Sequence, residues 1–486
     1  MGLDSINHIV VLALENRSFD HMLGFLYDQG NNLPPRGQQF DGLTGNETNP
    51  DANGKLVTIT RITNQTPNAY WYPLCNPGEG FKNYNQQLFD IDLNHAVPVP
   101  PNANNQGFVK NFTTALADAN AGQPGTDPPW PGAQDSSIMA AFTPEALPVI
   151  SALARGFAVC DGWFSSVPAH TIPNRAFLMA GTSQGHLNNS GTYSCPSIFG
   201  ALTGRQVSWK AYGYKTLPRM QLDFPDTQAA PSSCFGKFSD FQAEAASGQL
   251  PEFCYLEPDF GKMGNSQHPA DNVAAGEQFI HDVYRACRDG QAWNSTLLLI
   301  TYDEHGGNYD HVAPPTDATP PGDGATPDFG FDFARFGVRV PALLISPLIE
   351  AGTIYRAPAT GAPFDHTSVL ATARKRWGFD PLTNRDRAAP DFASALTLDA
   401  PRGDDPLAGV APPAVTPATD NAQNTVAAPT TPSNLQIAYA ERAANLSSTK
   451  VAAAQVPANL NTSEDYDNFI NDRLTEWDAA KPDRRT

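Results

Sequence analysis

The sequence has 486 residues, of which 41% are apolar, so it can form one large domain or several small ones with a sizeable core. Its formal net charge of −19 argues against nucleic-acid binding, because an acidic chain without a basic stripe repels the phosphate backbone. The charge also repels an anionic membrane, and no apolar run reaches the roughly 18 residues of a membrane-spanning helix.

The first predicted element is a short apolar run that stops at polar residues. Residues 9–14 form this run, and Glu15 and Asn16 follow it directly. Apolar runs of this length are typical of strands buried on both faces of a parallel sheet. We therefore expect a strand, a polar turn and then a short helix over residues 19–27. In open α/β sheets ligands bind beyond the carboxyl ends of the strands, so the turn is a candidate binding position.

Residues 30–135 are rich in Asn, Gly, Pro and aromatic residues, a composition typical of turns and extended loops. We interpret this stretch as a long, cap-like insertion beside the site. Some of its aromatic side chains could line an apolar entrance for lipid, or could simply pack the cap. These are Tyr70, Trp71, Tyr72, Phe81 and Tyr84.

Regular structure returns after the insertion. We expect a helix over residues 144–154, a strand that ends at Cys160, and a helix that begins near Pro173, since proline is favoured at a helix start. Thr171 would lie just ahead of this helix, where free N–H groups and the helix dipole favour phosphate. A metal ion beside its hydroxyl would lower the pKa of that group and make it a nucleophile. The alternative is a threonine that only caps the helix.

The second half of the chain contains further elements of both kinds. Residues 269–288 carry an apolar face at helical spacing, which predicts a helix. Residues 296–302 and 341–346 predict two more buried strands. An amphipathic helix is expected over residues 367–377.

We expect three parts along the chain. Residues 1–400 would form the catalytic domain, which includes the insertion; residues 401–433 a linker rich in Pro, Ala and Thr; and residues 434–486 a helical segment that packs on the core. Cys195 and Cys234 lie in loop-like sequence and could pair in an oxidising compartment.

Oxygen-bearing side chains follow two of the predicted strands. Glu15 and Asn16 follow the first strand, and Asp303 and Glu304 follow the strand over residues 296–302. Each acid alone could cap a helix or form a salt bridge, but together they would repel one another without a cation. Carboxylate and amide oxygens are the ligands that Ca²⁺, Mg²⁺ and Mn²⁺ prefer. The sequence therefore predicts a metal site at this edge of the sheet.

Several histidines lie in loops near predicted element ends. His305 and His311 follow the strand over residues 296–302, with Asp310 beside His311, while His268 and His366 precede helices. Gly306 and Gly307 would permit a tight turn and close backbone approach. Phosphoryl transfer needs positive groups and an acid for the leaving group, and histidine suits both roles. A lone histidine is also often a surface or buried structural residue.

Five motifs, in order along roughly residues 6–380, resemble those of the bacterial phospholipase C and acid phosphatase family of phosphoesterases, which includes plant non-specific phospholipases C. The motifs are Glu15-Asn16-Arg17-Ser18-Phe19-Asp20-His21, Thr171-x-Pro173-Asn174-Arg175, His268-Pro269 with Val273 and Gly276-Glu277, Asp303-Glu304-His305-Gly306-Gly307 through Asp310-His311-Val312, and Asp365-His366-Thr367-Ser368. The resemblance implies an α/β fold with an alkaline-phosphatase-like core, whose mostly parallel central sheet has helices on both faces.

The resemblance also implies roles for individual residues. One or two divalent cations would be held by Glu15, Asn16, Asp303, Glu304 and the Thr171 hydroxyl. Ca²⁺, Mg²⁺ and Mn²⁺ fit these oxygens, and Zn²⁺ is used by fold relatives. Thr171 would form a covalent phospho-enzyme that water hydrolyses. The other expected catalytic residues are His268, His311 and His366, and the expected substrate-binding residues are Asn16, Asn174, Arg175, Asp310 and His305. Arg175 could instead brace the loop.

We expect a phospholipase C-like enzyme that acts on a phosphate ester or phospholipid headgroup, with transient contact to a lipid surface. The alternatives are an acid phosphatase and a binding protein with an inactive site. A sulfatase is disfavoured, because Thr171 stands where that fold relative has a Cys or Ser. Ala169-His170 replaces the family's usual Gly-Pro, and an additional imidazole could therefore lie near the leaving group. The resemblance implies a secreted or periplasmic protein, although no signal peptide precedes the first strand; a cytoplasmic place is the alternative.

Overall fold

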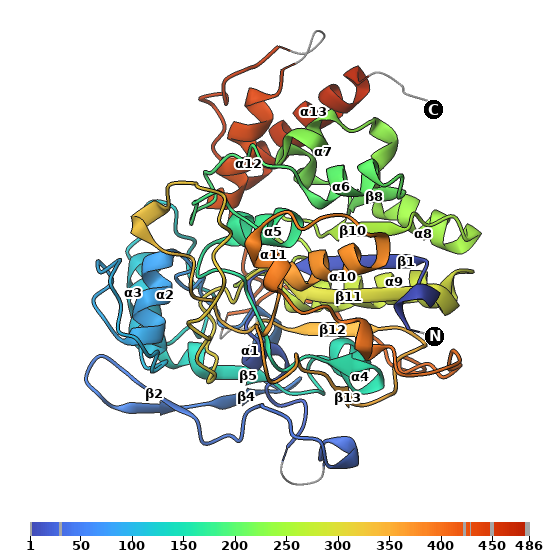
Figure 1. The fold of residues 1–486 in the computed structure, drawn as a ribbon. Coiled ribbons are helices and arrows are strands. Elements are labelled where there is room, and N and C mark those ends of the chain that lie inside the picture. Colours follow the sequence, from blue (N-terminus) through green and yellow to red (C-terminus); the bar gives the residue numbers. More distant parts are fainter. Residues whose placement is uncertain (1, 29–31, 421–423, 428, 448–451, 482–486) are drawn as a thin grey trace.

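The computed structural model shows an α/β fold built on one eight-stranded sheet (Figure 1). It describes residues 2–28, 32–420, 424–427, 429–447 and 452–481. From one edge of the sheet to the other the strands are β13 (Thr353–Ile354), β6 (Ala158–Val159), β12 (Ala342–Ile345), β11 (Thr296–Tyr302), β1 (His8–Leu14), β10 (Phe253–Glu257), β8 (Trp209–Gly213) and β9 (Phe235–Lys237).

β1 and β11 lie side by side at the centre of the sheet, and both are buried almost throughout. Their Leu, Ile and Val side chains favour a strand that is covered on both faces. The two strands run parallel, with Leu14 paired to Tyr302, and β10 lies parallel to β1 on its other side. This confirms the two predicted central strands. The residues that follow Leu14 and Tyr302 therefore meet at the same edge of the sheet.

β12 corresponds to the strand predicted over residues 341–346, and it runs antiparallel to both of its neighbours, β11 and β6. The pairs β10–β8, β8–β9 and β13–β6 are parallel, like the central pairs. The sheet is thus mostly parallel, which confirms the predicted fold class.

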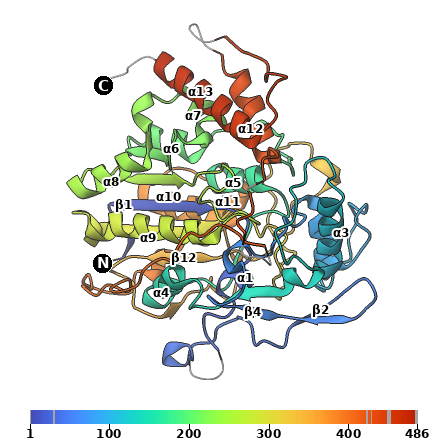
Figure 2. The ribbon, with the colours of Figure 1, turned by 180° about the vertical axis from the view of Figure 1, so that it is seen from behind.

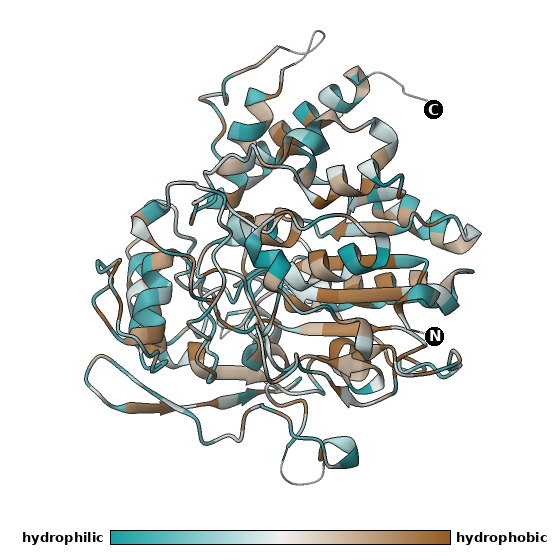
Figure 3. Cartoon of the chain, in the orientation of Figure 1, coloured by the Kyte–Doolittle hydropathy of each residue, from teal (hydrophilic) through white to brown (hydrophobic). Residues whose placement is uncertain are grey.

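Helices cover both faces of the sheet. α5 (Thr171–Ala180) and α10 (Thr367–Trp377) lie in front of it in Figure 1, while α4 (Pro148–Gly156) and α9 (Val273–Asp289) lie in front in the opposite view of Figure 2. α8 (Phe238–Ser247) lies beside α9. Figure 3 shows the central strands as hydrophobic and the outer faces of the helices as largely hydrophilic, as a layered fold requires.

Several predicted helix boundaries were wrong. α4 begins at Pro148 rather than at residue 144, with the proline in its first turn. α9 begins at Val273 rather than at residue 269, because the Asn272 side chain accepts a hydrogen bond from the Ala274 N–H and caps the helix there. α1 (Phe19–Leu23) ends before residue 27.

The insertion over residues 30–135 contains more regular structure than its composition suggests. Its elements are β2 (Thr48–Pro50), β3 (Leu56–Thr58), β4 (Thr60–Ile62), α2 (Phe81–Phe89) and α3 (Phe108–Asn120). β4 pairs with β5 (Ala140–Phe142), and α2 and α3 share a small core that is separate from the main one. In Figure 1 this region lies beyond the carboxyl ends of the central strands.

The C-terminal part contains α12 (Asn434–Asn445) and α13 (Ser463–Ala480), and Leu435 and Ile470 of these helices join the main core. The division of the chain into three parts remains a prediction. The other elements are α6 (Ile198–Gly204), α7 (Pro225–Ala229), α11 (Asn384–Ala388), β7 (Trp163–Phe164) and β14 (Phe364–Asp365). Short 3-10 turns occur at Leu3–Ser5, Pro35–Gly37, Ala69–Trp71, Asp135–Met139, Arg219–Leu222, Ser232–Cys234, Trp293–Ser295, Asp328–Gly330 and Ala393–Ala395.

Within the described residues, none of the helices has the length and apolar character needed to cross a membrane. The structure contains Cys195 and Cys234 as free thiols, like the other four cysteines, so the pairing that the sequence allowed is not formed.

Candidate active site

The polar residues that follow β1 and β11 meet at the carboxyl edge of the sheet. The backbone N–H of Asn16 donates to Asp303 Oδ1 (3.0 Å), and the Thr171 hydroxyl donates to Asn16 Oδ1 (3.3 Å). Asn16 has a φ of 56°, a left-handed conformation that asparagine tolerates better than most residues. We call Glu15, Asn16, Thr171, Asp303 and Glu304, the five predicted metal ligands, the Thr171 cluster.

Two glutamates of the Thr171 cluster are buried with an unsatisfied oxygen each. Glu15 Oε1 and Glu304 Oε1 have no hydrogen-bond partner among the described residues. Burial raises the pKa of Glu15 to about 7, although His268 and Arg175 partly offset this effect and Asp303 adds to it. Burial, with Glu79 and Asp303 nearby, raises the pKa of Glu304 well above its usual range. Buried carboxylates usually have a charged partner, so these orphaned oxygens fit a hard divalent cation.

Arg175 braces the cluster from within the protein. Its Nε donates to Asp303 Oδ2 (3.0 Å), and its Nη2 donates to the carbonyl oxygens of Ala13 and Leu14 (both 3.1 Å). Nη1 donates to the Tyr255 hydroxyl (3.0 Å). Of the two roles considered for Arg175, these contacts support bracing of the β1 end and of Asp303.

The nucleophile candidate lies inside a helix rather than ahead of one. α5 begins at Thr171 itself, and its N-cap residue is His170, so the prediction of a helix start near Pro173 was wrong. The Asn174 side chain holds the preceding loop: its Nδ2 donates to the carbonyl oxygens of Val167 and Ala169 (3.1 and 2.9 Å). These bonds fix the backbone that presents Thr171.

The Gly306–Gly307 turn permits the close approach that the sequence indicated. Both glycines have a positive φ, and a Cβ on Gly306 would lie 2.2 Å from the Asn16 carbonyl oxygen. A Cβ on Gly307 would lie 2.6 Å from the Gly78 carbonyl oxygen. The turn therefore packs between the loop after β1 and a loop of the insertion.

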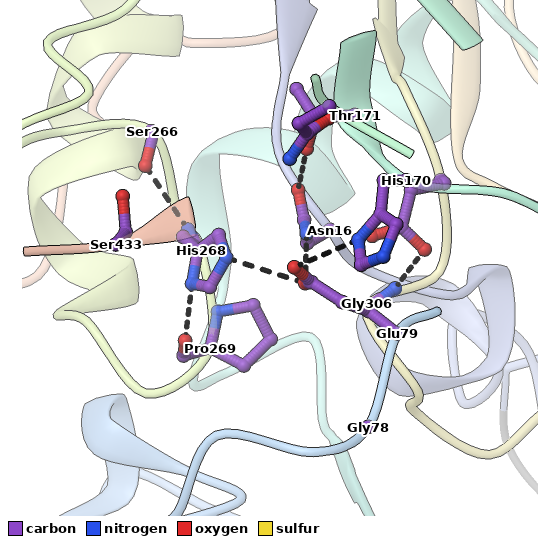
Figure 4. A network of polar contacts seen from close by, with 12 residues as sticks. Asn16, Gly78, Glu79, His170, Thr171, Ser266, His268, Pro269, Gly306 and Ser433 are labelled. Carbon is purple, nitrogen blue, oxygen red and sulfur yellow. Dashed lines mark hydrogen bonds and ion pairs between the residues drawn. The ribbon is translucent and has the colours of Figure 1, made fainter. Parts of the chain in front are cut away.

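That insertion loop brings Glu79 into the site, which sequence reasoning missed (Figure 4). Asn16 Nδ2 donates to Glu79 Oε2 (2.7 Å), His170 Nδ1 lies 3.3 Å from Oε1, and His268 Nε2 lies 3.5 Å from Oε2. The only local signal was an acid between Gly78 and Gly80, which indicates a turn but no distant partner. Burial opposes the charge on His268, yet the contact with Glu79 prevails and raises the pKa of His268 to about 9.

His305 and His366 are buried and support acids of the cluster. His305 lies between Gln87 Oε1 (2.8 Å from Nε2) and Glu304 Oε2 (3.2 Å from Nδ1). The Trp163 Nε1–H donates to His366 Nδ1 (3.4 Å), so Nε2 carries the proton toward the Asp303 carbonyl oxygen (2.6 Å). Burial lowers the pKa of His305 to about 3 and that of His366 to about 4, so both are neutral.

His311 and Asp310 belong to a second group of charges, which we call the Arg339 cluster: Asp20, Asp310, His311 and Arg339. The atoms of Asp20, Asp310 and His311 that could bind a metal ion lie within 4.8 Å of one another, so this group could also hold such an ion. However, Arg339 already donates to Asp310 Oδ1 and Asp20 Oδ1 (both 2.9 Å), and His311 Nδ1 lies 2.7 Å from Asp20 Oδ2. The guanidinium of Arg339 thus supplies the positive charge that a metal ion would otherwise supply.

A cavity of about 420 Å³ opens onto the site. Glu79 and His170 line it, together with Asn83, Asn111 and Asp118 of the insertion. Its lining thus includes His170, the residue before Thr171.

Comparison with known proteins identifies the family. The profile of the family described as "Phosphoesterase family" matches residues 6–380. This chain is a member of the phosphoesterase family. It is 34% identical to the non-specific phospholipase C6 of Arabidopsis thaliana over 83% of this chain and 74% of that one. It is 30% identical to phospholipase C B of Mycobacterium tuberculosis over 82% of this chain and 79% of that one. The resemblance found in the five motifs is confirmed.

Among solved structures, a protein of the alkaline phosphatase superfamily from Vibrio parahaemolyticus matches 51% of this chain and 65% of that one, with 13% identity and a TM-score of 0.30. As a member of the phosphoesterase family, the chain is a hydrolase of phosphoric ester bonds.

The aromatic residues of the insertion mostly pack inside this phosphoesterase. Trp71 packs on Trp130 (ring centroids 4.5 Å apart), and the Tyr84 hydroxyl donates to Glu304 Oε2 (3.0 Å). Phe81 stacks on Phe329 (5.4 Å), which is 46% exposed. Tyr84 therefore positions a predicted metal ligand and does not line an entrance.

Proposed function

We propose that this phosphoesterase cleaves phospholipid headgroups in the manner of a phospholipase C, with Thr171 as a covalent nucleophile. The observation that carries the proposal is the position of the Thr171 hydroxyl. It lies 3.3 Å from Asn16 Oδ1, beside Asp303 and two buried glutamates with unsatisfied oxygens. The names of the relatives supply the substrate class.

We propose that Glu15, Asn16, Asp303, Glu304 and the Thr171 hydroxyl hold one divalent cation, and their oxygens suit Ca²⁺, Mg²⁺ or Mn²⁺. When bound, the cation lowers the pKa of the Thr171 hydroxyl and neutralises charge on the phosphoryl oxygens. Without it, the buried acids would repel an anionic substrate. All further steps use groups of the chain itself.

In the proposed first step, the Thr171 hydroxyl releases its proton to solvent, and Oγ1 forms a bond to phosphorus while the bond from phosphorus to the glycerol oxygen breaks. The diacylglycerol oxygen takes a proton, which we assign to His268, since its contact with Glu79 keeps its imidazole protonated. In the second step water attacks the phosphothreonine and the P–Oγ1 bond breaks. One proton of the water returns to His268 and the other goes to Thr171 Oγ1, and the phosphorylated headgroup leaves as a dianion. Arg175 and Asn174 keep the Thr171 backbone and Asp303 in place throughout.

We also propose transient contact with a lipid surface. Val97 (40% exposed) lines an apolar cleft of about 450 Å³, and the partly exposed Phe329 adjoins two other residues that line it, Gly330 and Phe331. Exposed apolar groups beside a cleft are typical of surfaces that bind apolar partners.

The test compares wild type with Thr171→Ala on p-nitrophenylphosphorylcholine and p-nitrophenyl phosphate, with and without chelator. We expect turnover of the diester to exceed that of the monoester, and both chelation and Thr171→Ala to reduce it by at least about 10³-fold. Turnover that neither change affects would contradict the mechanism. A preference for the monoester would favour an acid phosphatase.

A further inference from the structure

The backbone on both sides of Glu79 is held in place by contacts with the rest of the site. Gln87 of α2 donates from Nε2 to the Gly78 carbonyl oxygen (2.7 Å), and Gly307 packs against the same oxygen. Gly80 lies so close to His170 that a Cβ there would be 3.1 Å from the imidazole Nε2. The loop is therefore fixed on both sides of Glu79, with the carboxylate directed at Asn16, as Figure 4 shows.

The contact between Glu79 and Asn16 decides how the Asn16 amide is oriented. A carboxylate can only accept hydrogen bonds, so the amide nitrogen must face Glu79 Oε2, 2.7 Å away. The amide oxygen then faces the opposite way, where it accepts from the Thr171 hydroxyl (3.3 Å). With the amide reversed, an NH₂ group would face Thr171, and nitrogen with two protons cannot bind a cation.

The same carboxylate also holds two imidazoles around the cluster. Its Oε1 lies 3.3 Å from His170 Nδ1, and its Oε2 lies 3.5 Å from His268 Nε2. His170 is one of the two residues that stand in place of the family's usual Gly-Pro, and it lines the 420 Å³ cavity. One side chain of the insertion thus connects the β1 turn, the residue before Thr171 and the loop before α9.

We propose that Glu79 is a positioning residue of the Thr171 cluster, which keeps the oxygen of the Asn16 amide directed at the cation and at Thr171. Glu79 makes and breaks no bond in the reaction. This inference rests on the proposed function, since it assumes that Asn16 Oδ1 is a ligand. It gives the insertion a specific task in forming the site.

The test measures Mn²⁺ binding to the full chain by isothermal titration calorimetry for wild type, Glu79→Met and Glu79→Gln. Methionine fills a similar volume, but its thioether is only a weak hydrogen-bond acceptor and does not hold the Asn16 amide. We therefore expect the Mn²⁺ affinity to fall about tenfold to a hundredfold. Glutamine keeps an acceptor oxygen that can hold the Asn16 nitrogen, so affinity should stay within about threefold of wild type. Glu47→Gln is the matched control, because Glu47 lies in the same insertion and its carboxylate accepts hydrogen bonds from its neighbours Thr44 and Gly45.

Wild-type affinity in Glu79→Met would overturn the inference. An equal loss in Glu79→Gln would also overturn it, because the charge and not the amide orientation would then matter. Glu79→Ala carries the same prediction if circular dichroism shows that Glu79→Met is unfolded. Failure of the proposed function has a different signature: wild type would bind no Mn²⁺, or Thr171→Ala would remain active.

Discussion

The Thr171 cluster and the Arg339 cluster both contain buried acidic side chains but differ in how their charge is balanced. In the Arg339 cluster, one guanidinium donates to both Asp20 and Asp310. In the Thr171 cluster, Arg175 pairs with Asp303, while Glu15 and Glu304 each keep an oxygen that no described residue satisfies. The Arg339 cluster balances its charge within the chain, whereas the unsatisfied acids of the Thr171 cluster support the proposal that it binds a cation.

The largest expected effect on stability comes from Arg339→Met. The substitution removes the guanidinium from the fully buried Asp20 and Asp310 and leaves His311 as their remaining cation, so the free energy of unfolding should fall by about 3–5 kcal/mol, with or without added cation. Urea unfolding measures this loss. Arg36→Met is the control, because Arg36 pairs with Glu350 at the surface and should contribute less than about 1 kcal/mol. A small loss for Arg339→Met would show that the two clusters do not differ as described.

The next largest expected effect is the loss of stabilisation by cation in Glu304→Gln. Wild type should gain about 2.7 kcal/mol of stability at a cation concentration of 100 times Kd, and the variant should lose most of this gain. Without cation the variant should be at least as stable as wild type, because glutamine replaces a carboxyl that has an oxygen without a partner and whose charged form burial disfavours. Thermal unfolding with and without Mn²⁺ measures both. Glu277→Gln should keep the cation response, since Glu277 only caps α4 through Val149 and Ile150.

The smallest expected effect is the pH dependence of the Arg339 cluster. Burial opposes the charge of His311, but Asp20 and Asp41 prevail and raise its pKa from 6.5 to about 10. The folded state therefore binds this proton more tightly, so the stabilisation is complete below pH 6.5 and is lost as the pH rises toward 10. His311→Gln should flatten this part of the stability curve. An unchanged curve would mean that His311 is not held as an imidazolium.

The sequence was sufficient to predict the residues that follow the central strands, but not those that the insertion brings to the site. Glu15 and Asp303 could be placed together because parallel strands bring their carboxyl ends to one edge, whatever the rest of the chain does. Glu79 could not be predicted, because its contacts depend on how residues 30–135 return to the sheet. The start of α5 at Thr171 was also missed, since proline is compatible with several positions in the first turn.

The histidines show the same limit. His268, His305, His311 and His366 all follow or precede predicted elements, and nothing in their local sequence distinguishes a charged imidazole from a neutral support. The partners of each imidazole decide it: His268 and His311 face carboxylates, while His366 lies between Trp163 and a backbone carbonyl. Such partners come from distant parts of the chain.

The most direct test of the account is to locate a phosphoryl adduct after acid quench of the working enzyme. Trypsin releases residues 156–175 as one peptide, which contains Thr171 together with Ser165 and Ser166. We predict that mass spectrometry of enzyme quenched during turnover of p-nitrophenylphosphorylcholine finds phosphorylcholine on Thr171, and that chelator abolishes this adduct. An active enzyme whose adduct lies on another residue, or forms equally well with chelator, would contradict the claim that the Thr171 cluster is a cation-dependent nucleophile site.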